Sequence, residues 1–262
     1  MKLCIEQIRT ISIMNKFNLG LCSVSFRNNL AEEVIKAVSE AGLGYIEWAS
    51  NCHAPYNDLE ALQNIVSLQK QYGIKCSSYG TYFYLMHNNI EELETYIKAA
   101  KMLGTKVLRL WCGKRASADY SFQEKQELFA KCRKAAKIAE RENVILCMEF
   151  HRNSFTDTAE SSIELMQAVD SPNFKMYWQP TLGVSEETII RNAHLISPYT
   201  VNIHVFYYID NVQQNLSKGI NLWKRYLKEF SSNKTLLLEF IPGGNIETLP
   251  LEAKALKEFV NN

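Results

Sequence analysis

Short apolar runs alternate with segments of helical periodicity along almost the whole chain. Apolar runs of four to eight residues are typical of buried strands, whereas apolar residues at i, i+3 and i+4 that end at a glycine are typical of helices. The pattern predicts eight strand and helix pairs with a period of roughly 30 residues. The predicted strands are 19–26, 44–48, 74–80, 106–111, 144–150, 174–179, 201–206 and 235–240, and the helices that follow them are 30–42, 59–72, 90–104, 122–142, 158–169, 186–196, 220–230 and 251–260.

Eight units of this size predict a single (β/α)8 TIM barrel of the α/β class, over residues 16–262. An open, doubly wound sheet would also alternate strands and helices. Such a sheet shows a glycine fingerprint after its first strand when it binds a dinucleotide, and residues 19–29 have none. Residues 1–15 fit no repeating unit, so we interpret them as an N-terminal extension and assign them no function.

Composition restricts the classes of partner. Of the 262 residues 47% are hydrophobic, and 29 Lys and Arg stand against 28 Asp and Glu, a formal charge of +1. This balance gives no broad attraction to nucleic acid or to a membrane surface, and no segment is apolar for the length of a bilayer span. The first 16 residues lack the apolar stretch of a signal peptide. Seven cysteines without a CxxC pair indicate a reducing compartment, so we expect a cytoplasmic protein.

Polar side chains follow the predicted strands at their carboxyl ends, where TIM barrels carry their functional residues. Glu149, Gln179, His204 and Glu239 end strands five to eight, so barrel closure would gather them around one point. Two carboxylates, one amide oxygen and one imidazole nitrogen suit a divalent ion such as Mn, Mg, Co or Zn. The sequence therefore predicts one divalent metal site with a position open for an oxygen-rich ligand.

The order of these four positions also carries a family resemblance, together with SVSF on the first strand, EW and then HAP after the second, SYG on the third and RLWCG on the fourth. The combination resembles the xylose isomerase-like barrel superfamily, and within it the sugar phosphate isomerase/epimerase type. The resemblance spans about residues 17–260.

The resemblance implies roles for the four residues. In that family, strands five to eight supply glutamate, aspartate, histidine and glutamate to one divalent metal, and the two glutamates act as acid and base. Carried over by position, Glu149 and Glu239 are ligands and catalytic groups, and His204 is a ligand. Gln179 occupies the aspartate position. Glutamine still offers an oxygen but loses a negative charge, which weakens the site or changes the preferred ion.

The implied activity is isomerisation or epimerisation of a small sugar or sugar phosphate through a metal-stabilised enediolate. His151 lies on the same strand face as Glu149 and is a candidate substrate contact, as is His53 in the second loop. Trp111 would give a flat wall for a sugar, and Lys114 would meet a phosphate or carboxylate.

Two other functions stay open. The superfamily also contains endonucleases that cut at abasic sites with several zinc ions, but this chain has only five histidines and a neutral charge balance, which disfavours that class. A non-catalytic barrel that binds a sugar or metabolite is the other alternative, and Gln179 is the residue that keeps it open. The sequence leaves the oligomeric state undecided, a homo-oligomer included. The aromatic residues of 81–85 fit either a substrate wall or packing against a neighbouring loop or subunit.

Overall fold

The chain folds into a closed barrel of eight parallel strands. The structure, a computed structural model, describes residues 17–231 and 233–261, so the extension expected over 1–15 lies outside the described residues. The order around the barrel is β1-β10-β7-β6-β5-β4-β3-β2, and every neighbouring pair is parallel. The strands are β1 (Asn18–Cys22), β2 (Tyr45–Ala49), β3 (Lys75–Leu85), β4 (Val107–Cys112), β5 (Ile145–Glu149), β6 (Phe174–Trp178), β7 (Thr200–Val205) and β10 (Thr235–Leu238).

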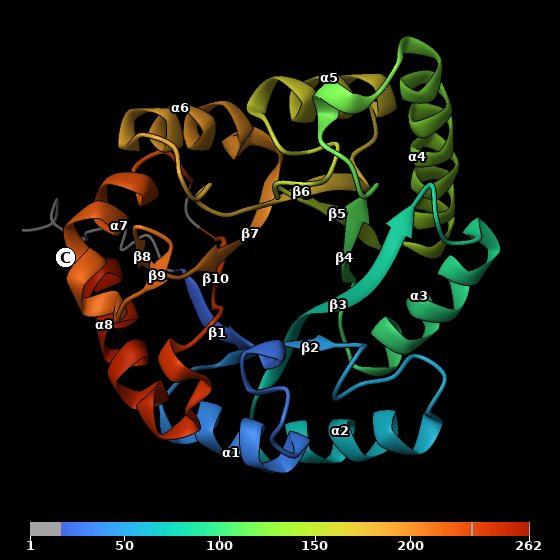
Figure 1. The fold of residues 1–262 in the computed structure, drawn as a ribbon. Helices are drawn as coiled ribbons and strands as arrows, with labels where there is room; N and C mark the ends of the chain where they lie inside the picture. The colour runs from blue at the N-terminus through green and yellow to red at the C-terminus, as the bar shows by residue number, and fades with distance from the viewer. Residues whose placement is uncertain (1–16, 232, 262) are drawn as a thin grey trace, which may run out of the picture.

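Helices surround the barrel as an outer ring (Figure 1). The α-helices are α1 (Ala31–Glu40), α2 (Leu59–Tyr72), α3 (Leu93–Met102), α4 (Phe122–Glu142), α5 (Ala159–Val169), α6 (Glu186–Ile196), α7 (Ile220–Leu227) and α8 (Leu249–Asn261). Short 3-10 helices are η2 (Ser23–Phe26), η3 (Ile90–Glu92), η4 (Ser117–Asp119), η5 (Ser197–Tyr199), η6 (Leu216–Gly219), η7 (Pro242–Gly244) and η8 (Ile246–Thr248). The alternation confirms the predicted (β/α)8 TIM barrel. Within the described residues, no helix is both long and apolar enough to cross a membrane.

Side chains of alternate strand residues point outward to the helices or inward to the barrel axis. The outward layer forms the larger core and buries the rings of Trp48, Trp178 and Trp223 completely. The inward layer is a second, smaller apolar cluster that includes Cys147 and Tyr177. Buried charged side chains lie next to this inward cluster and form part of the functional site.

The predicted strands differ from the structure by one or two residues at their ends, except for two that differ by more. The strand expected over 19–26 ends at Cys22, because its partner β10 ends at Leu238 and offers no further pairing, and residues 23–26 form η2 instead. The strand expected over 74–80 continues to Leu85. A register shift after Gly80 and a positive φ of 52° at Tyr82 interrupt its pairing with β4. The aromatic residues of 81–85 therefore belong to β3.

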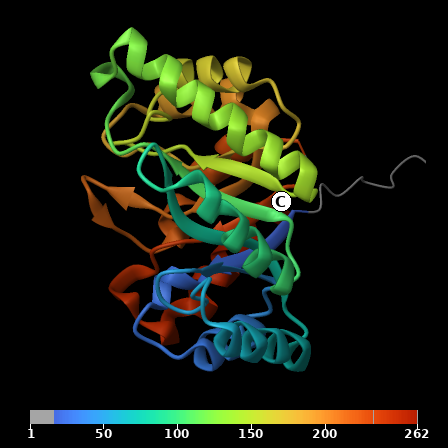
Figure 2. The same cartoon turned by 90° about the vertical axis from the view of Figure 1, so that its right-hand side faces the viewer.

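A two-stranded hairpin that the sequence pattern did not predict follows β7. Its strands are β8 (Tyr208–Ile209) and β9 (Val212–Gln213). Asp210 and Asn211 connect them with φ values of 50° and 61°, the left-handed conformation that two-residue hairpin turns require. Figure 2 shows the hairpin projecting from one end of the barrel.

Candidate functional site

Four side chains converge at the carboxyl ends of four neighbouring strands. Glu149 ends β5, His204 lies in β7, and Gln179 and Glu239 directly follow β6 and β10. Each side chain is buried, with an exposed fraction of 7% or less. The sequence predicted these residues as one cluster, and the structure brings them together.

The donor atoms of this cluster surround Nδ1 of His204. Gln179 Oε1 lies 2.9 Å from that nitrogen, Glu239 Oε2 lies 3.2 Å away and Glu149 Oε1 lies 3.8 Å away. Donors that share one ion at about 2.1 Å are roughly 3.0–3.4 Å apart when they are adjacent. Glu239 Oε2 is buried without a hydrogen-bond partner among the described residues. The spacing and this unpartnered oxygen both fit the donor set of one divalent ion.

Cys22 adds a donor that the sequence did not predict as part of the site. One metal-ligating atom each from Cys22, His204 and Glu239 lie within 4.8 Å of one another. Burial, with help from Glu47, raises the pKa of Cys22 well above its usual value, so the thiol keeps its proton in the ion-free protein. Cys22 is therefore a soft donor at the edge of a site made mainly of oxygen atoms.

Arg109 lies inside the barrel between two glutamates and was not predicted as a site residue. Its Nε donates to Glu47 Oε1 at 2.9 Å, and its Nη1 donates to Glu149 Oε2. Nη2 also lies 2.9 Å from Glu47 Oε1 but is not aligned for a hydrogen bond. An exposed fraction of 2% makes this an internal ion pair. Arg109 thus holds one oxygen of Glu149 and leaves the other facing His204.

Glu47 is fixed from its other side by neutral groups. The Tyr177 hydroxyl donates to Glu47 Oε2 at 2.7 Å, and the Ser78 hydroxyl donates to the same oxygen at 3.0 Å. Burial alone would raise the pKa of Glu47, but Arg109 and His204 outweigh it and hold the pKa below its usual value. Glu47 is therefore a charged anchor for Arg109 at the base of the site.

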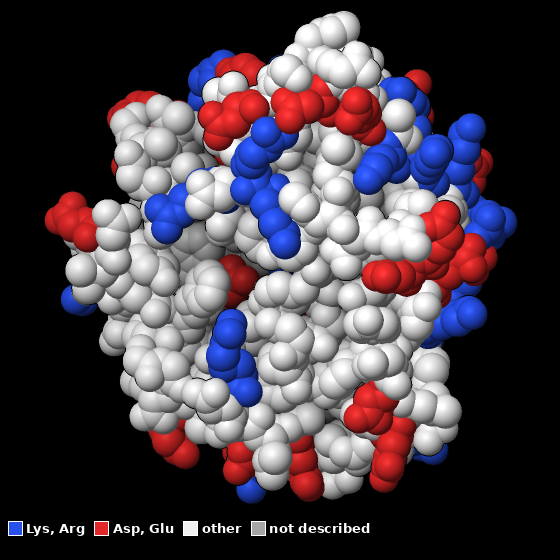
Figure 3. Space-filling model, turned by 45° about the vertical axis from the view of Figure 1, so that its right-hand side comes forward, with Lys and Arg blue, Asp and Glu red and all other residues white. Residues whose placement is uncertain are grey.

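The buried charges of the site do not cancel. Glu47, Glu149 and Glu239 supply three buried carboxylates against the one buried guanidinium of Arg109, an excess of two acidic groups. Burial alone would lower the pKa of His204, but the Glu239 carboxylate outweighs burial and holds the pKa above its usual value, so a proton on His204 would offset one of the excess negative charges. A divalent cation would balance them, since isolated buried charge is costly. Figure 3 shows acidic atoms at the bottom of a hollow with Lys and Arg side chains around its rim.

Aromatic rings form a wall next to this cluster. Trp111 and His151 meet edge to face with ring centroids 4.5 Å apart, and Tyr84 stacks on Trp111 at 5.5 Å. Lys114 is exposed, and its ammonium lies 4.4 Å from the centre of the Tyr84 ring. The predicted substrate contacts Trp111, His151 and Lys114 therefore lie along one continuous wall.

His53 is engaged locally in the second loop. Its Nε2 lies 3.1 Å from the carbonyl oxygen of Asn29, and its Nδ1 lies 3.1 Å from Cys52 Sγ. The ring also meets Trp48 edge to face. Because both ring nitrogens contact neighbouring residues, the contacts of His53 indicate a structural role. Substrate binding by His53 stays a prediction.

A cavity of about 270 Å³ opens next to the cluster, and we call it the mouth cavity. Gln179 and His151 line it, together with the basic side chain of Arg152 and the aromatic rings of Phe206 and Tyr208. This volume suits a ligand of the size of a monosaccharide. An exposed arginine on the wall favours a ligand that carries a negative charge.

Residues 35–205 match the xylose isomerase-like TIM barrel family, which is more than half of the chain. The chain belongs to this family. The match and the closed barrel confirm the resemblance seen in the sequence.

One curated relative is a 3-dehydroshikimate dehydratase of Bacillus anthracis, 28% identical over 166 residues, which are 60% of this chain and 59% of the relative. The aligned segment thus spans less than two thirds of the relative's length. Among solved structures, a probable 3-DHS dehydratase of Bacillus anthracis superposes with a TM-score of 0.76 at 20% identity, covering 92% of this chain and 99% of that one.

A D-allulose 3-epimerase of Methylomonas sp. superposes with a TM-score of 0.73 at 12% identity, covering 93% of this chain and 98% of that one. A xylose isomerase-like barrel protein of Mycobacterium smegmatis, solved in complex with magnesium, gives a TM-score of 0.68 at 11% identity, covering 94% of this chain and 96% of that one. At such identities these likenesses show the fold alone.

Proposed function

We propose that this protein is a divalent-metal-dependent enzyme that removes a proton next to the carbonyl group of a small polyhydroxylated substrate. The observation that carries the proposal is the convergence of three oxygen donors on His204 Nδ1, at 2.9, 3.2 and 3.8 Å. The excess of buried carboxylates over the single guanidinium of Arg109 also supports a cation at this site.

Glu149, Gln179, His204 and Glu239 would hold the ion. When bound, the ion supplies a Lewis acid that polarises a carbonyl oxygen and lowers the cost of negative charge on it. Glu239 is our choice for the group that accepts the proton from carbon, through the carboxylate oxygen that does not hold the ion, because Arg109 occupies one oxygen of Glu149. Glu149, held through Oε2 by Arg109, would keep its orientation as the proton moves.

Two products can follow from this first step. The sequence resemblance favours return of the proton, which is isomerisation or epimerisation of a sugar, and the likeness to a D-allulose 3-epimerase supports it. Loss of a neighbouring hydroxyl as water is dehydration. The curated relative matched by sequence is named for dehydration of 3-dehydroshikimate, so we place dehydration of a hydroxylated cyclic ketone first and epimerisation second.

Arg152 on the wall of the mouth cavity favours an anionic substrate of either class. Its guanidinium would meet the carboxylate of 3-dehydroshikimate or the phosphate of a sugar phosphate, whereas a neutral sugar gains nothing from that charge. The wall of Trp111 and His151 would cover one face of a ring.

The test is incubation of the manganese-loaded protein with 3-dehydroshikimate, D-allulose and its phosphate in deuterated water. Mass spectrometry follows loss of water, and NMR follows deuterium on carbon. We expect metal-dependent turnover of at least one substrate, reduced about 100-fold or more in both Glu149→Gln and Glu239→Gln. Glu127→Gln on the exposed face of α4 is the matched control and should retain full activity. Turnover that survives in both site variants would rule out the assigned roles.

A further inference from the structure

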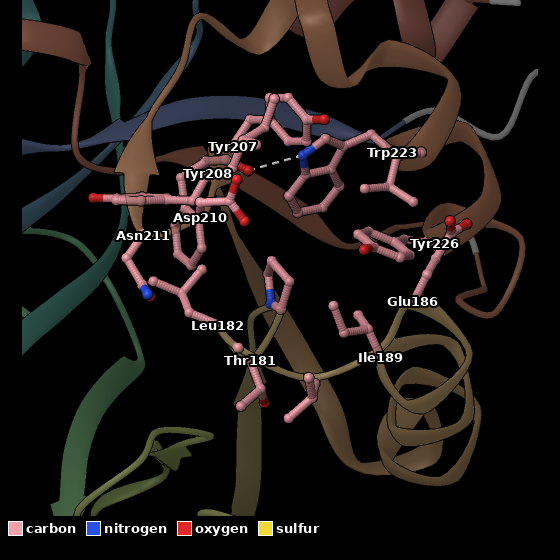
Figure 4. A pocket seen from close by; sticks show the side chains of 16 residues that line it. Thr181, Leu182, Glu186, Ile189, Tyr207, Tyr208, Asp210, Asn211, Trp223 and Tyr226 are labelled. Atoms are coloured by element: carbon pink, nitrogen blue, oxygen red, sulfur yellow. Dashed lines mark hydrogen bonds between the residues drawn. The ribbon is translucent and has the colours of Figure 1, made fainter.

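A second cavity of about 470 Å³ lies beside the mouth cavity, and we call it the side chamber. It is bounded by the loop after β6, by α6, by the β8–β9 hairpin and by α7 (Figure 4). Leu182, Phe206, Tyr208 and Asn211 are among the residues that line both cavities. The two cavities therefore share part of their walls. One shared wall begins at Pro180, which directly follows Gln179.

The walls of the side chamber are aromatic and rigidly held. Trp223 is completely buried, and its Nε1 donates to the carbonyl oxygen of Phe206 at 3.0 Å. Its ring packs on Phe259 with centroids 5.7 Å apart and meets Tyr226 edge to face at 5.5 Å. Trp223 therefore supports the wall from behind, and the partly exposed rings of the lining are those of Tyr207 and Tyr208. Rings held on a preformed wall lower the entropic cost of binding a ligand ring.

Tyr226 directs a hydroxyl into the side chamber, as Figure 4 shows. The residue is 2% exposed, yet none of the described residues hydrogen-bonds to this hydroxyl. Burial, followed by the nearby Glu186 carboxylate, raises the pKa of Tyr226, so the hydroxyl keeps its proton and can both donate and accept. The hydroxyl is not among the fully buried unpartnered atoms, so it faces the space of the chamber and is available to a polar ligand atom there.

The charges of the lining indicate which ligands fit. Glu186 and Asp210 are its only charged residues in the described part of the chain. Glu186 is paired with Arg225, and Asp210 lies on the exposed turn of the hairpin. Without Lys or Arg in the lining, a phosphate or carboxylate would lose its water and gain no partner. With Glu186 already paired, a cation gains little as well.

We propose that the side chamber binds an uncharged aromatic ring that carries one hydrogen-bonding group, such as a phenol, with the ring against the partly exposed rings of Tyr207 and Tyr208 and the polar group on the Tyr226 hydroxyl. Because the chamber shares walls with the mouth cavity, such a ring would be the distal part of a ligand whose polar head lies near Gln179. This second part rests on the proposed function; binding of the ring itself does not.

Phenol and toluene are the probes, because they differ by the one hydroxyl that Tyr226 would meet. Methyl NMR of the full chain, without added metal, should show phenol shifting the methyl signals of Leu182, Ile189 and Leu222, which line the chamber. Tyr226→Phe should weaken phenol roughly three- to tenfold, the effect of one hydrogen bond, and leave toluene unchanged. Tyr199→Phe removes a hydroxyl from η5, outside the chamber, and should change neither.

Benzoate and benzylammonium test the charge argument, and each should bind at least about tenfold more weakly than phenol. Equal binding of either ion, an unchanged phenol affinity in Tyr226→Phe, or signal changes confined to residues outside the chamber would overturn the proposal. The same titration of the Glu149→Gln/Glu239→Gln double variant should still show phenol binding. This titration therefore distinguishes failure of the proposed metal-dependent chemistry from failure of ring binding in the side chamber.

Discussion

Arg109 Nε donates to Glu47 Oε1 at 2.9 Å inside the barrel, where neither side chain is more than 2% exposed. Removal of one partner leaves the other charge buried, so we expect Arg109→Met to lower the free energy of unfolding by about 3–5 kcal/mol. Arg141→Met breaks an exposed pair with Glu94 and should cost about 1 kcal/mol or less. Guanidinium denaturation measures both. Equal costs would show that the internal pair contributes no more than a surface pair.

Gly80 is required by this same ion pair. A Cβ at position 80 would lie 2.8 Å from Arg109 Nη2 and 2.9 Å from Glu47 Oε1, both closer than real contacts. We expect Gly80→Ala to destabilise the fold by about 1–3 kcal/mol, as overpacking does. At Gly44 an added Cβ meets nothing within 4 Å, so Gly44→Ala is the matched control and should change stability by about 0.5 kcal/mol or less. A harmless Gly80→Ala would contradict the packing described for Arg109.

His53 should make the fold sensitive to acid. Burial lowers its pKa below 6.5, and hydrogen bonds to the backbone of Asn29 and Phe26 offset this only in part. As the pH falls through 6.5, the unfolded chain takes up the proton before the folded chain does, so the free energy of unfolding falls until the lower folded pKa is passed. Urea unfolding between about pH 8 and about pH 5.5 should show a smaller loss of stability in His53→Gln than in the original chain. The same loss in both proteins would exclude His53 as a cause.

Gln179 gives a test of the charge at the metal site. Gln179→Asp adds a carboxylate where the family pattern has one, and we expect Mn2+ to bind roughly tenfold more tightly or better, because affinity rises with ligand charge. Isothermal calorimetry measures the change. Gln63→Asp, on the exposed face of α2, adds the same charge away from the site and should leave the affinity unchanged. A weaker Gln179→Asp protein would place this residue outside the ligand set.

Helices with complete end signals were predictable from the sequence. Residues 59–72 and 122–142 have the predicted bounds, because Asp58 and Ser121 cap their first turns and Gly73 and Asn143 end them in the left-handed conformation. The barrel and its four-residue cluster were predictable from the regular alternation of strands and helices, because closure of the barrel places the ends of successive strands together.

The features that the sequence did not predict depend on pairing between distant segments of the chain. The length of β3 is set by contacts of Tyr84 with Trp111 in β4, which periodicity within one segment does not contain. Arg109 was missed as well, because a single charge in an apolar strand identifies no partner. The one available signal for Arg109 was its position as a single charge in an apolar strand. The corresponding signal for the hairpin was the pair of adjacent turn-forming residues Asp210 and Asn211.

The most direct measurement is the metal content of the protein. Elemental analysis after purification without chelator, followed by Mn2+ titration, should give one divalent ion per chain, and the content should fall to a small fraction in His204→Leu. His194→Leu, on the exposed face of α6, is the control and should retain the ion. Several zinc ions per chain would support the nuclease class instead. No bound ion, or full binding by His204→Leu, would contradict the metal centre on which this account depends.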